Sequence, residues 1–303
     1  MDAIPSVGGT SNNLHRSYPN IPQAIHLLLL GWLLLVLISI PIVLLEKASG
    51  VPFTKHPATD AFMSLIALGL LLLLGLKKTR ASFQNVFPMA PIRLAFLLPM
   101  SLTVLGLGIL LSEVDNFFRT ILPAPQWISD VFAKLMQTDK RLWGSILALV
   151  IVPPLTEELL FRGLILRGFL SRYTVNKAVV ASAILFGVFH LIPWQILGAT
   201  VWGFLFGWWF VTTHSLLPCL FGHALANAFP LLISNLPLEI QGMTGAVADR
   251  VQFQPLWLDS FGLVLAGVGL WLLVRMFRSE KNVSRADGHA SQLQQDSCRT
   301  QDE

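Results

Sequence analysis

A set of polar and ionisable residues interrupts three otherwise apolar runs of the sequence: Glu157, Glu158, Arg162, His190, His223 and Asn227. An ionisable side chain costs about 2.5 to 3.5 kcal/mol at the centre of a membrane-spanning helix, so such residues are usually paired or functional. A carboxylate, two imidazoles and an amide that converge can activate a water molecule and bind an oxyanion. Hydrolysis is therefore the chemistry that these residues indicate.

Spacing along a helix predicts which of these residues act together. Glu158 and Arg162 are four apart, so they share a face and can form a bidentate salt bridge. Glu157 projects about 100° away from Glu158, which leaves its carboxylate free to face a polar cavity. His223 and Asn227 are also four apart. Glu157, His190 and the pair His223 and Asn227 lie on three different predicted helices. They converge only if these three helices pack around a common point.

The segment before the two glutamates contains Pro153 and Pro154. Proline lacks a backbone N–H and disrupts a helix interior. We therefore expect the incoming segment to break at the prolines and a new helix to begin with Thr156 as its N-cap.

Composition places these residues in a membrane. Of 303 residues, 54% are hydrophobic and 13% are charged, against about 25% charged in a typical soluble domain. A spanning helix needs about 20 apolar residues, so eight spans would use about 160 residues. The net charge of +4 does not indicate a nucleic-acid partner, because no basic stripe is interleaved with aromatic residues.

The fold class that follows is an all-α, polytopic bundle of about eight transmembrane helices. Basic residues are more frequent on the side that carries both termini, so the positive-inside rule places both termini in the cytoplasm. The eight apolar runs cover residues 25–45, 58–76, 92–111, 142–170, 177–192, 195–211, 216–234 and 256–277.

The predicted organisation is a single membrane domain, 21–278, with its catalytic core at about 140–234. The polar ends, 1–20 and 279–303, are expected to be disordered. The stretch 128–136 has the periodicity of an amphipathic helix on the external surface. Gly203 and Gly207 form a G-x-x-x-G motif, which we expect to serve packing within the chain rather than dimerisation.

Three strings occur in order and carry a family resemblance: Glu157-Glu158-x-x-x-Arg162, Phe186-x-x-x-His190 and His223-x-x-x-Asn227. They resemble the motifs of the CAAX protease and bacteriocin-processing (CPBP) family of intramembrane glutamic endopeptidases, which includes the type II CAAX prenyl endopeptidase. The resemblance covers about residues 140 to 234. It implies a membrane-embedded endopeptidase acting on a peptide or a lipidated, CAAX-like protein substrate.

The resemblance also implies a role for each motif residue. Glu157 would be the general base for the attacking water, which His190 would also hold. His223 and Asn227 would donate hydrogen bonds to the oxyanion. Behind them, the motif residues Glu158, Arg162 and Phe186 would aim Glu157 and pack against the site.

Zinc is the alternative to a metal-free mechanism, because Glu157, His190 and His223 are possible zinc ligands. Asn227 is a poor zinc ligand, and the sequence contains no H-E-x-x-H motif. A mechanism without a cofactor is therefore the preferred prediction.

Two other functions are compatible with the same residues. The chain could be a non-catalytic membrane scaffold or a bacteriocin self-immunity protein of this family, with Glu158 and Arg162 as a structural bridge. It could also be a proton-coupled transporter that uses Glu157 as its carrier, although paired inverted halves are not evident. The expected location is the plasma membrane, as a multi-pass protein in contact with membrane lipid.

Overall fold

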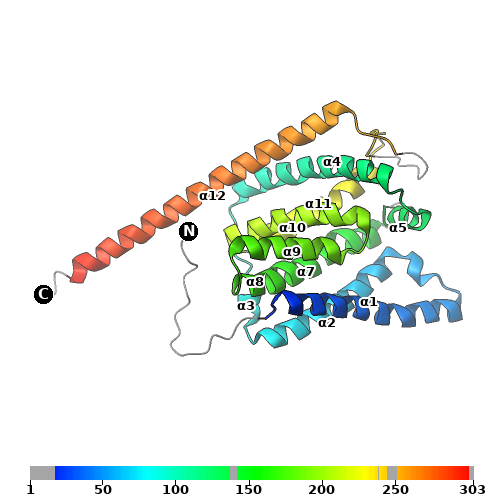
Figure 1. Cartoon of the computed structure of the whole chain (residues 1–303), viewed down its shortest axis with the longest axis horizontal. Coiled ribbons are helices and arrows are strands. Elements are labelled where there is room, and N and C mark those ends of the chain that lie inside the picture. The colour runs from blue at the N-terminus through cyan, green and yellow to red at the C-terminus, as the bar shows by residue number, and fades with distance from the viewer. Residues whose placement is uncertain (1–17, 137–141, 238, 244–250, 300–303) are drawn as a thin grey trace.

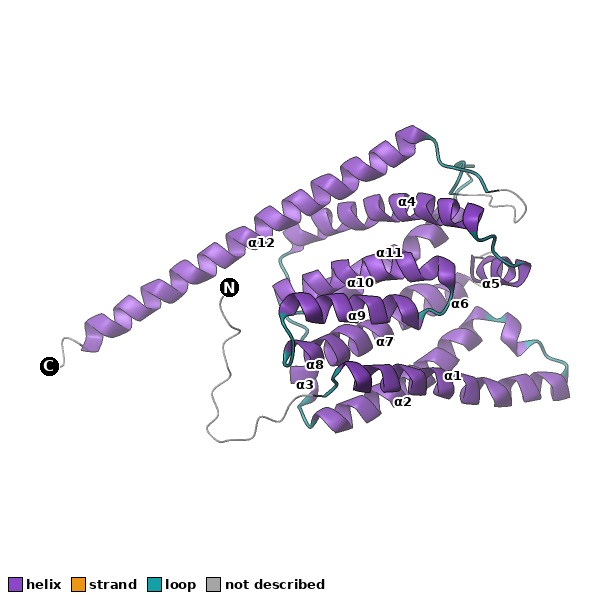
Figure 2. Ribbon diagram, viewed as in Figure 1, coloured by secondary structure: helices purple, strands orange, loops and turns teal. Residues whose placement is uncertain are grey.

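The computed structural model describes residues 18–136, 142–237, 239–243 and 251–299. This described part is built from helices and contains no strand (Figure 2). The prediction of an all-α fold is therefore confirmed.

The helices follow one another along the chain, and a long connection separates α11 from α12 (Figure 1). Two π-helical segments, Ile146–Ile151 and Leu159–Leu166, join α6, α7 and α8 into one continuous rod. The bounds are α1 Ile21–Ser49, α2 Pro57–Thr79, α3 Phe83–Val86, α4 Leu97–Ile121, α5 Gln126–Met136, α6 Leu142–Ser145, α7 Val152–Glu158, α8 Arg167–Leu170, α9 Val175–Phe189, α10 Pro193–Thr213, α11 Leu217–Ser234 and α12 Leu256–Arg299.

Seven segments of the described chain are long and apolar enough to cross a membrane. The predicted fifth run corresponds to α9, which has 15 residues and is about 22 Å long at 1.5 Å per residue. It is therefore shorter than the hydrocarbon core, which is about 30 Å thick. The seven segments are Ile21–Ser49, Pro57–Thr79, Leu94–Ile121, Leu142–Leu170, Pro193–Thr213, Leu217–Ser234 and Leu256–Glu280.

The helices pack as a layered bundle (Figure 1). Helices α4 and α12 lie along one side, α1 and α2 along the other, and the rods that carry the motif residues lie between them. The start of α1 and the end of α12 lie toward the same end of the bundle. That both termini face the cytoplasm stays a prediction from the distribution of basic residues.

Two stretches at the ends of the bundle that were predicted to be disordered take part in helices or cap them. Asn20 caps α1, since its Oδ1 accepts a 2.9 Å hydrogen bond from the Gln23 amide. Residues 279–299, predicted to be disordered, instead continue α12 to Arg299; this stretch contains no proline to end the helix. Residues 1–17 and 300–303 lie outside the described part.

The amphipathic stretch 128–136 is helical, within α5. Ile128 on this helix is buried, at 1% exposure, whereas Trp127 is 63% exposed. The helix thus places one face against the protein. Its position on the external membrane surface stays a prediction.

The expected break at Pro153 and Pro154 is wrong. The rod is helical on both sides of the prolines, and the Thr156 hydroxyl donates to the Val152 carbonyl at 2.8 Å instead of capping a helix start. The physical reason is that a proline is tolerated in the first turn of a regular helical segment and that a neighbouring helix can supply the donor that it lacks. The π-helical turn before it changes the hydrogen-bond register at this point.

Helices α9 and α10 form a tight hairpin through small residues. A methyl group added at Gly203 would lie 2.8 Å from the Ala183 Cα, and one at Gly207 would lie 3.2 Å from Val179. Both glycines therefore face α9. This contact confirms the expectation that the G-x-x-x-G motif serves packing within the chain.

Gly203→Ala should lower the free energy of unfolding by about 1 to 3 kcal/mol, because the new methyl group meets backbone atoms of α9. Gly198→Ala is the matched control on the same helix, since a methyl group there meets nothing within 4 Å. Thermal unfolding of both variants in detergent measures the difference. Equal stability of the two variants would contradict the close α9–α10 contact.

Candidate active site

Among the described residues, the two charged side chains buried most deeply form an ion pair across one helical turn. Arg162 Nη1 donates to Glu158 Oε1 at 2.9 Å, and the two side chains are 1% and 0% exposed. The predicted pairing is thus present, through one hydrogen bond rather than a bidentate contact. Arg162 Nη2 also donates to the Gly203 carbonyl at 3.4 Å, which connects the pair to α10.

A histidine from a third helix completes this buried network. His223, on α11, has its Nδ1 at 2.7 Å from the same Oε1 of Glu158. If Glu158 is ionised, it can only accept, so the proton of this contact lies on Nδ1. One carboxylate oxygen thereby holds both Arg162 and His223, and the orientation of the imidazole is fixed.

Glu157 lies on the other side of the imidazole. Its Oε2 is 3.9 Å from His223 Nε2, which is too long for a direct hydrogen bond. This Oε2 is buried and has no hydrogen-bond partner in the described part of the chain, while the Glu157 side chain as a whole is 14% exposed. The expectation that Glu157 lacks an equivalent ion-pair partner therefore agrees with the structure.

Aromatic rings surround the network. The Phe186 ring lies 5.1 Å from the His190 ring and 5.8 Å from the His223 ring, and the Arg162 guanidinium lies 4.6 Å above it. Phe206 stacks on His223 at 5.6 Å and lies 5.5 Å from the Arg162 guanidinium. Phe186 therefore packs against the site, as its place in the motif implies.

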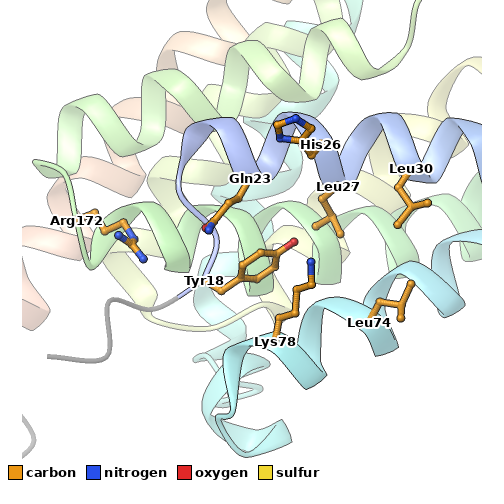
Figure 3. Close-up of a pocket in the computed structure, with 8 residues that line it drawn as sticks. All are labelled: Tyr18, Gln23, His26, Leu27, Leu30, Leu74, Lys78 and Arg172. Carbon is orange, nitrogen blue, oxygen red and sulfur yellow. The ribbon is translucent and has the colours of Figure 1, made fainter. Parts of the chain in front are cut away.

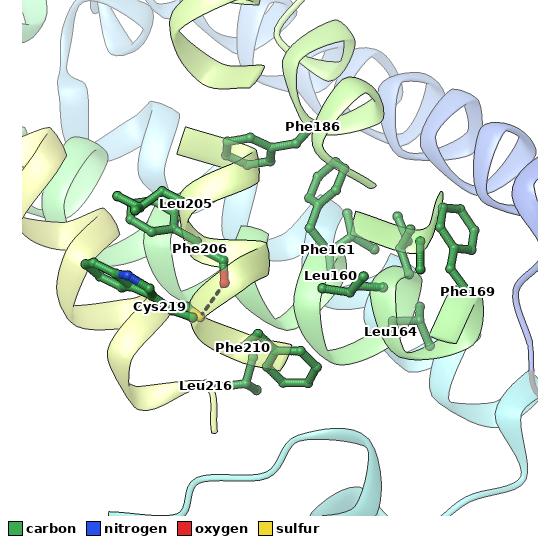
Figure 4. Close-up of a cluster of buried hydrophobic side chains, with 14 of the residues drawn as sticks. Leu160, Phe161, Leu164, Phe169, Phe186, Leu205, Phe206, Phe210, Leu216 and Cys219 are labelled. Carbon is green, nitrogen blue, oxygen red and sulfur yellow. Dashed lines mark hydrogen bonds between the residues drawn. The ribbon is translucent and has the colours of Figure 1, made fainter. Parts of the chain in front are cut away.

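Phe206 was not predicted as part of the site. It follows Gly203 by three residues, so both lie on one face of α10, and that spacing was the available signal. The buried core continues behind it, where the Cys219 thiol donates to the Phe206 carbonyl at 3.2 Å (Figure 4). The packed side chains of this core keep water away from the inner side of the network.

His190 makes its hydrogen bond with the backbone one helical turn before it. It follows directly after α9, and its Nδ1 is 2.9 Å from the Phe186 carbonyl. Within the described part of the chain, His190 makes no hydrogen bond or ion pair with Glu157. The structure therefore brings together Glu157, Glu158, Arg162 and His223, and connects His190 to them through the Phe186 ring.

Asn227 lies one turn after His223 and faces the proline-containing rod. Its Nδ2 donates to the Leu149 carbonyl at 2.8 Å. In a regular helix this carbonyl would accept from the N–H of residue 153, but Pro153 has none. Asn227 thus satisfies a carbonyl that the proline leaves without its usual donor, as neighbouring helices often do in membranes.

The possible zinc ligands are not gathered into one set. Among the described residues, no group of three His, Cys, Asp or Glu side chains is close enough to hold a metal ion. Glu157 and His223 lie side by side, whereas the third candidate, His190, contacts Phe186. In this conformation the donors do not fit the three-ligand arrangement of a zinc enzyme.

Arg162→Ala should lower the free energy of unfolding by about 3 to 5 kcal/mol, because it leaves Glu158 as a buried charge without its cation. The matched control is Arg119→Ala, which breaks a partly exposed pair with Asp115 at the same helical spacing. Such exposed pairs contribute about 0 to 1 kcal/mol. Unfolding in detergent would show the contrast, and similar losses in the two variants would contradict the buried network.

Asn227→Ala should cost about 1 to 3 kcal/mol, because the Leu149 carbonyl loses its donor. Asn176→Ala provides the control, since Asn176 is exposed at the start of α9 and a surface change is expected to stay within about 0.5 kcal/mol. Chemical unfolding of the two variants measures both effects. If Asn227→Ala unfolds like the wild type, the side-chain amide does not stabilise the rod.

Comparisons with known proteins find similarity over part of the chain. The chain is 30% identical over 149 residues to the uncharacterized protein YyaK of Bacillus subtilis (strain 168), an alignment that covers 44% of this chain and 50% of that protein. The chain thus spans about half the length of the curated relative that it matches. No solved structure matches.

A family model matches the region that contains every motif residue. Residues 139–229 match the family described as type II CAAX prenyl endopeptidase Rce1-like. Together with the apolar spans, this match indicates a multi-pass membrane protein and supports a function of the intramembrane-protease kind. The resemblance carried by the three motifs is therefore confirmed: the segment that contains the paired glutamates is similar to the Rce1-like CAAX protease family.

Proposed function

We propose that this protein is an intramembrane endopeptidase that uses Glu157 to activate water. The observation that supports the proposal is the buried, unpartnered Glu157 Oε2 facing His223 Nε2 at 3.9 Å. A water molecule can bridge two polar groups that are separated by more than about 3.5 Å. Because Glu157 Oε2 is buried, the surrounding side chains must move apart to admit that water. Glu157 is then placed to take a proton from that water.

The proposed reaction is the addition of water to a peptide carbonyl. Glu157 accepts a proton as the water oxygen bonds to the carbonyl carbon, and the carbonyl oxygen becomes an oxyanion. When the C–N bond breaks, Glu157 returns the proton to the leaving amine. The protein itself supplies every group in this step.

His223 has two possible states, both with a proton on Nδ1 shared with Glu158. Without a proton on Nε2, the ring accepts a hydrogen bond and can hold the water beside Glu157. With a proton there, it is an imidazolium that can donate to the oxyanion. An oxyanion donor of this kind contributes about 2.7 to 4 kcal/mol to transition-state stabilisation.

The other two motif residues complete the proposed site. Asn227 uses one N–H of its amide on Leu149 and has a second N–H for an oxyanion. His190 is assigned to the water by family resemblance alone. Its ring contacts the Phe186 ring, which also contacts His223.

The proposed substrate is a membrane-anchored or lipidated protein with a CAAX-like end, hydrolysed at the plasma membrane without a metal cofactor. The motifs and the match to the Rce1-like family support this class of substrate. The apolar helices around the site would give a lipid-linked segment direct access from the bilayer.

Glu157→Gln tests the proposal, because it keeps the shape of the side chain while removing the base. The variant should cleave lipidated and transmembrane peptides at least about 100-fold more slowly than the wild type, the lower end of the contribution of a general base. Glu239→Gln, which alters an exposed loop carboxylate, is the control and should keep full activity. Unfolding temperatures of all three proteins show whether each is folded.

The outcomes separate the proposal from its alternatives. Equal cleavage by the wild type and Glu157→Gln would remove Glu157 from the mechanism. A wild type that cleaves no peptide of the panel would favour the scaffold or self-immunity function. Activity that a chelator abolishes and only Zn²⁺ restores would overturn the metal-free mechanism.

A further inference from the structure

A cleft at one end of the bundle lies between the start of α1, the end of α2 and the turn from α8 to α9. Its volume is about 730 Å³, within the range of about 300 to 1,000 Å³ that is typical of ligand sites. Figure 3 shows that its polar side chains gather at one end and its leucines at the other. The cleft is thus amphipathic along its length.

The polar end of the cleft carries two cations. Lys78 comes from α2 and Arg172 from the turn after α8. The Lys78 ammonium lies 5.3 Å from the centre of the Tyr18 ring, and burial raises the pKa of the Tyr18 phenol, which therefore stays a neutral hydrogen-bond donor. Among the lining residues that the structure describes, the other polar ones are Gln23 and His26, which carry no negative charge. The described lining of this end therefore has a net positive charge.

The apolar end is formed by three leucines on two helices. Leu27 and Leu30 lie one turn apart on α1, and Leu74 lies one turn before Lys78 on α2. Leu27 is buried, while Leu30 is 36% and Leu74 is 45% exposed. The leucines therefore continue from the cations toward the middle of the two spans, the direction in which a lipid chain runs.

The cleft lies where the bilayer surface is expected. Lys78 is at the end of one spanning segment, and Tyr18 precedes the start of another. Tyrosine side chains commonly occupy this interface. Basic pockets between spanning helices on the cytoplasmic side are typical sites for anionic lipid head groups. This end of the bundle is also the end that the distribution of basic residues assigns to the cytoplasm.

We propose that this cleft binds one anionic phospholipid. Its phosphate lies between Lys78 and Arg172, with the Tyr18 hydroxyl as a donor, and one acyl chain follows Leu27, Leu30 and Leu74. A zwitterionic lipid would bring its own cation to the basic end, and a free phosphate would leave the leucines uncovered. The charge and the apolar wall together therefore select an anionic amphiphile.

The test is native mass spectrometry of the full-length protein in detergent, titrated with phosphatidylglycerol, phosphatidylcholine or inorganic phosphate. Lys78→Gln/Arg172→Gln should weaken phosphatidylglycerol binding about 30-fold, from the usual contribution of each basic residue at an anionic surface. Lys77→Gln/Arg80→Gln removes the same charge from neighbouring exposed residues outside the cleft. The affinity of this control variant for phosphatidylglycerol should lie within about 3-fold of that of the wild type.

A second pair of variants tests the acyl chain. Leu74→Gln should weaken binding of phosphatidylglycerol, whereas Leu73→Gln, next to it but 64% exposed and outside the lining, should not. Unfolding temperatures confirm that each variant is folded.

Three results would overturn the proposal. Phosphatidylcholine could bind as tightly as phosphatidylglycerol, or both charge variants could lose binding equally, which would indicate general attraction to a basic surface. Inorganic phosphate could displace the lipid while Leu74→Gln binds normally, which would indicate a phosphate site without a lipid.

Discussion

The rest of the site depends on one oxygen atom, Glu158 Oε1. Burying a carboxylate in an apolar bundle is costly unless it is paired and hydrogen-bonded. Here a single oxygen accepts from Arg162 at 2.9 Å and lies 2.7 Å from His223 Nδ1. Since Arg162 also donates to Gly203, three helical rods are held at one point. The neighbouring residue, Glu157, is thereby left with an unpartnered oxygen at a defined position beside the imidazole.

The proline-containing rod provides a second connection between the same helices. Pro153 cannot donate to the Leu149 carbonyl, and Asn227 donates to it instead. Because His223 and Asn227 are one turn apart on α11, that helix is attached to the rod both at Glu158 and at Leu149. Leu149 lies within the first π-helical segment, and Glu158 ends the α-helical segment that follows it. Single π-helical turns are frequent at functional sites.

The contacts that the sequence predicted are those within one helix or between small residues. The spacing of Glu158 and Arg162 predicted their pairing, and Gly203 with Gly207 predicted close helix packing within the chain. Contacts between helices depend on the rotation and register of each rod, which spacing along one helix does not determine. The sequence therefore did not predict that His223 contacts Glu158, that Phe206 stacks on the imidazole, or that the Phe186 ring contacts both His190 and His223. The continuous rod through Pro153 was missed because a π-helical turn has no simple sequence signal.

The most direct test of the network is the protonation of His223 Nδ1, measured by ¹⁵N NMR of the histidine-labelled protein and assigned with His223→Gln. An ionised Glu158 requires a proton on Nδ1, in a strong hydrogen bond that weakens in Glu158→Gln, whether or not Nε2 is also protonated. An unprotonated Nδ1 in the folded wild type would mean that Glu158 is the donor. The charged pair with Arg162 would then be absent, and the account of how Glu157 is held would be contradicted.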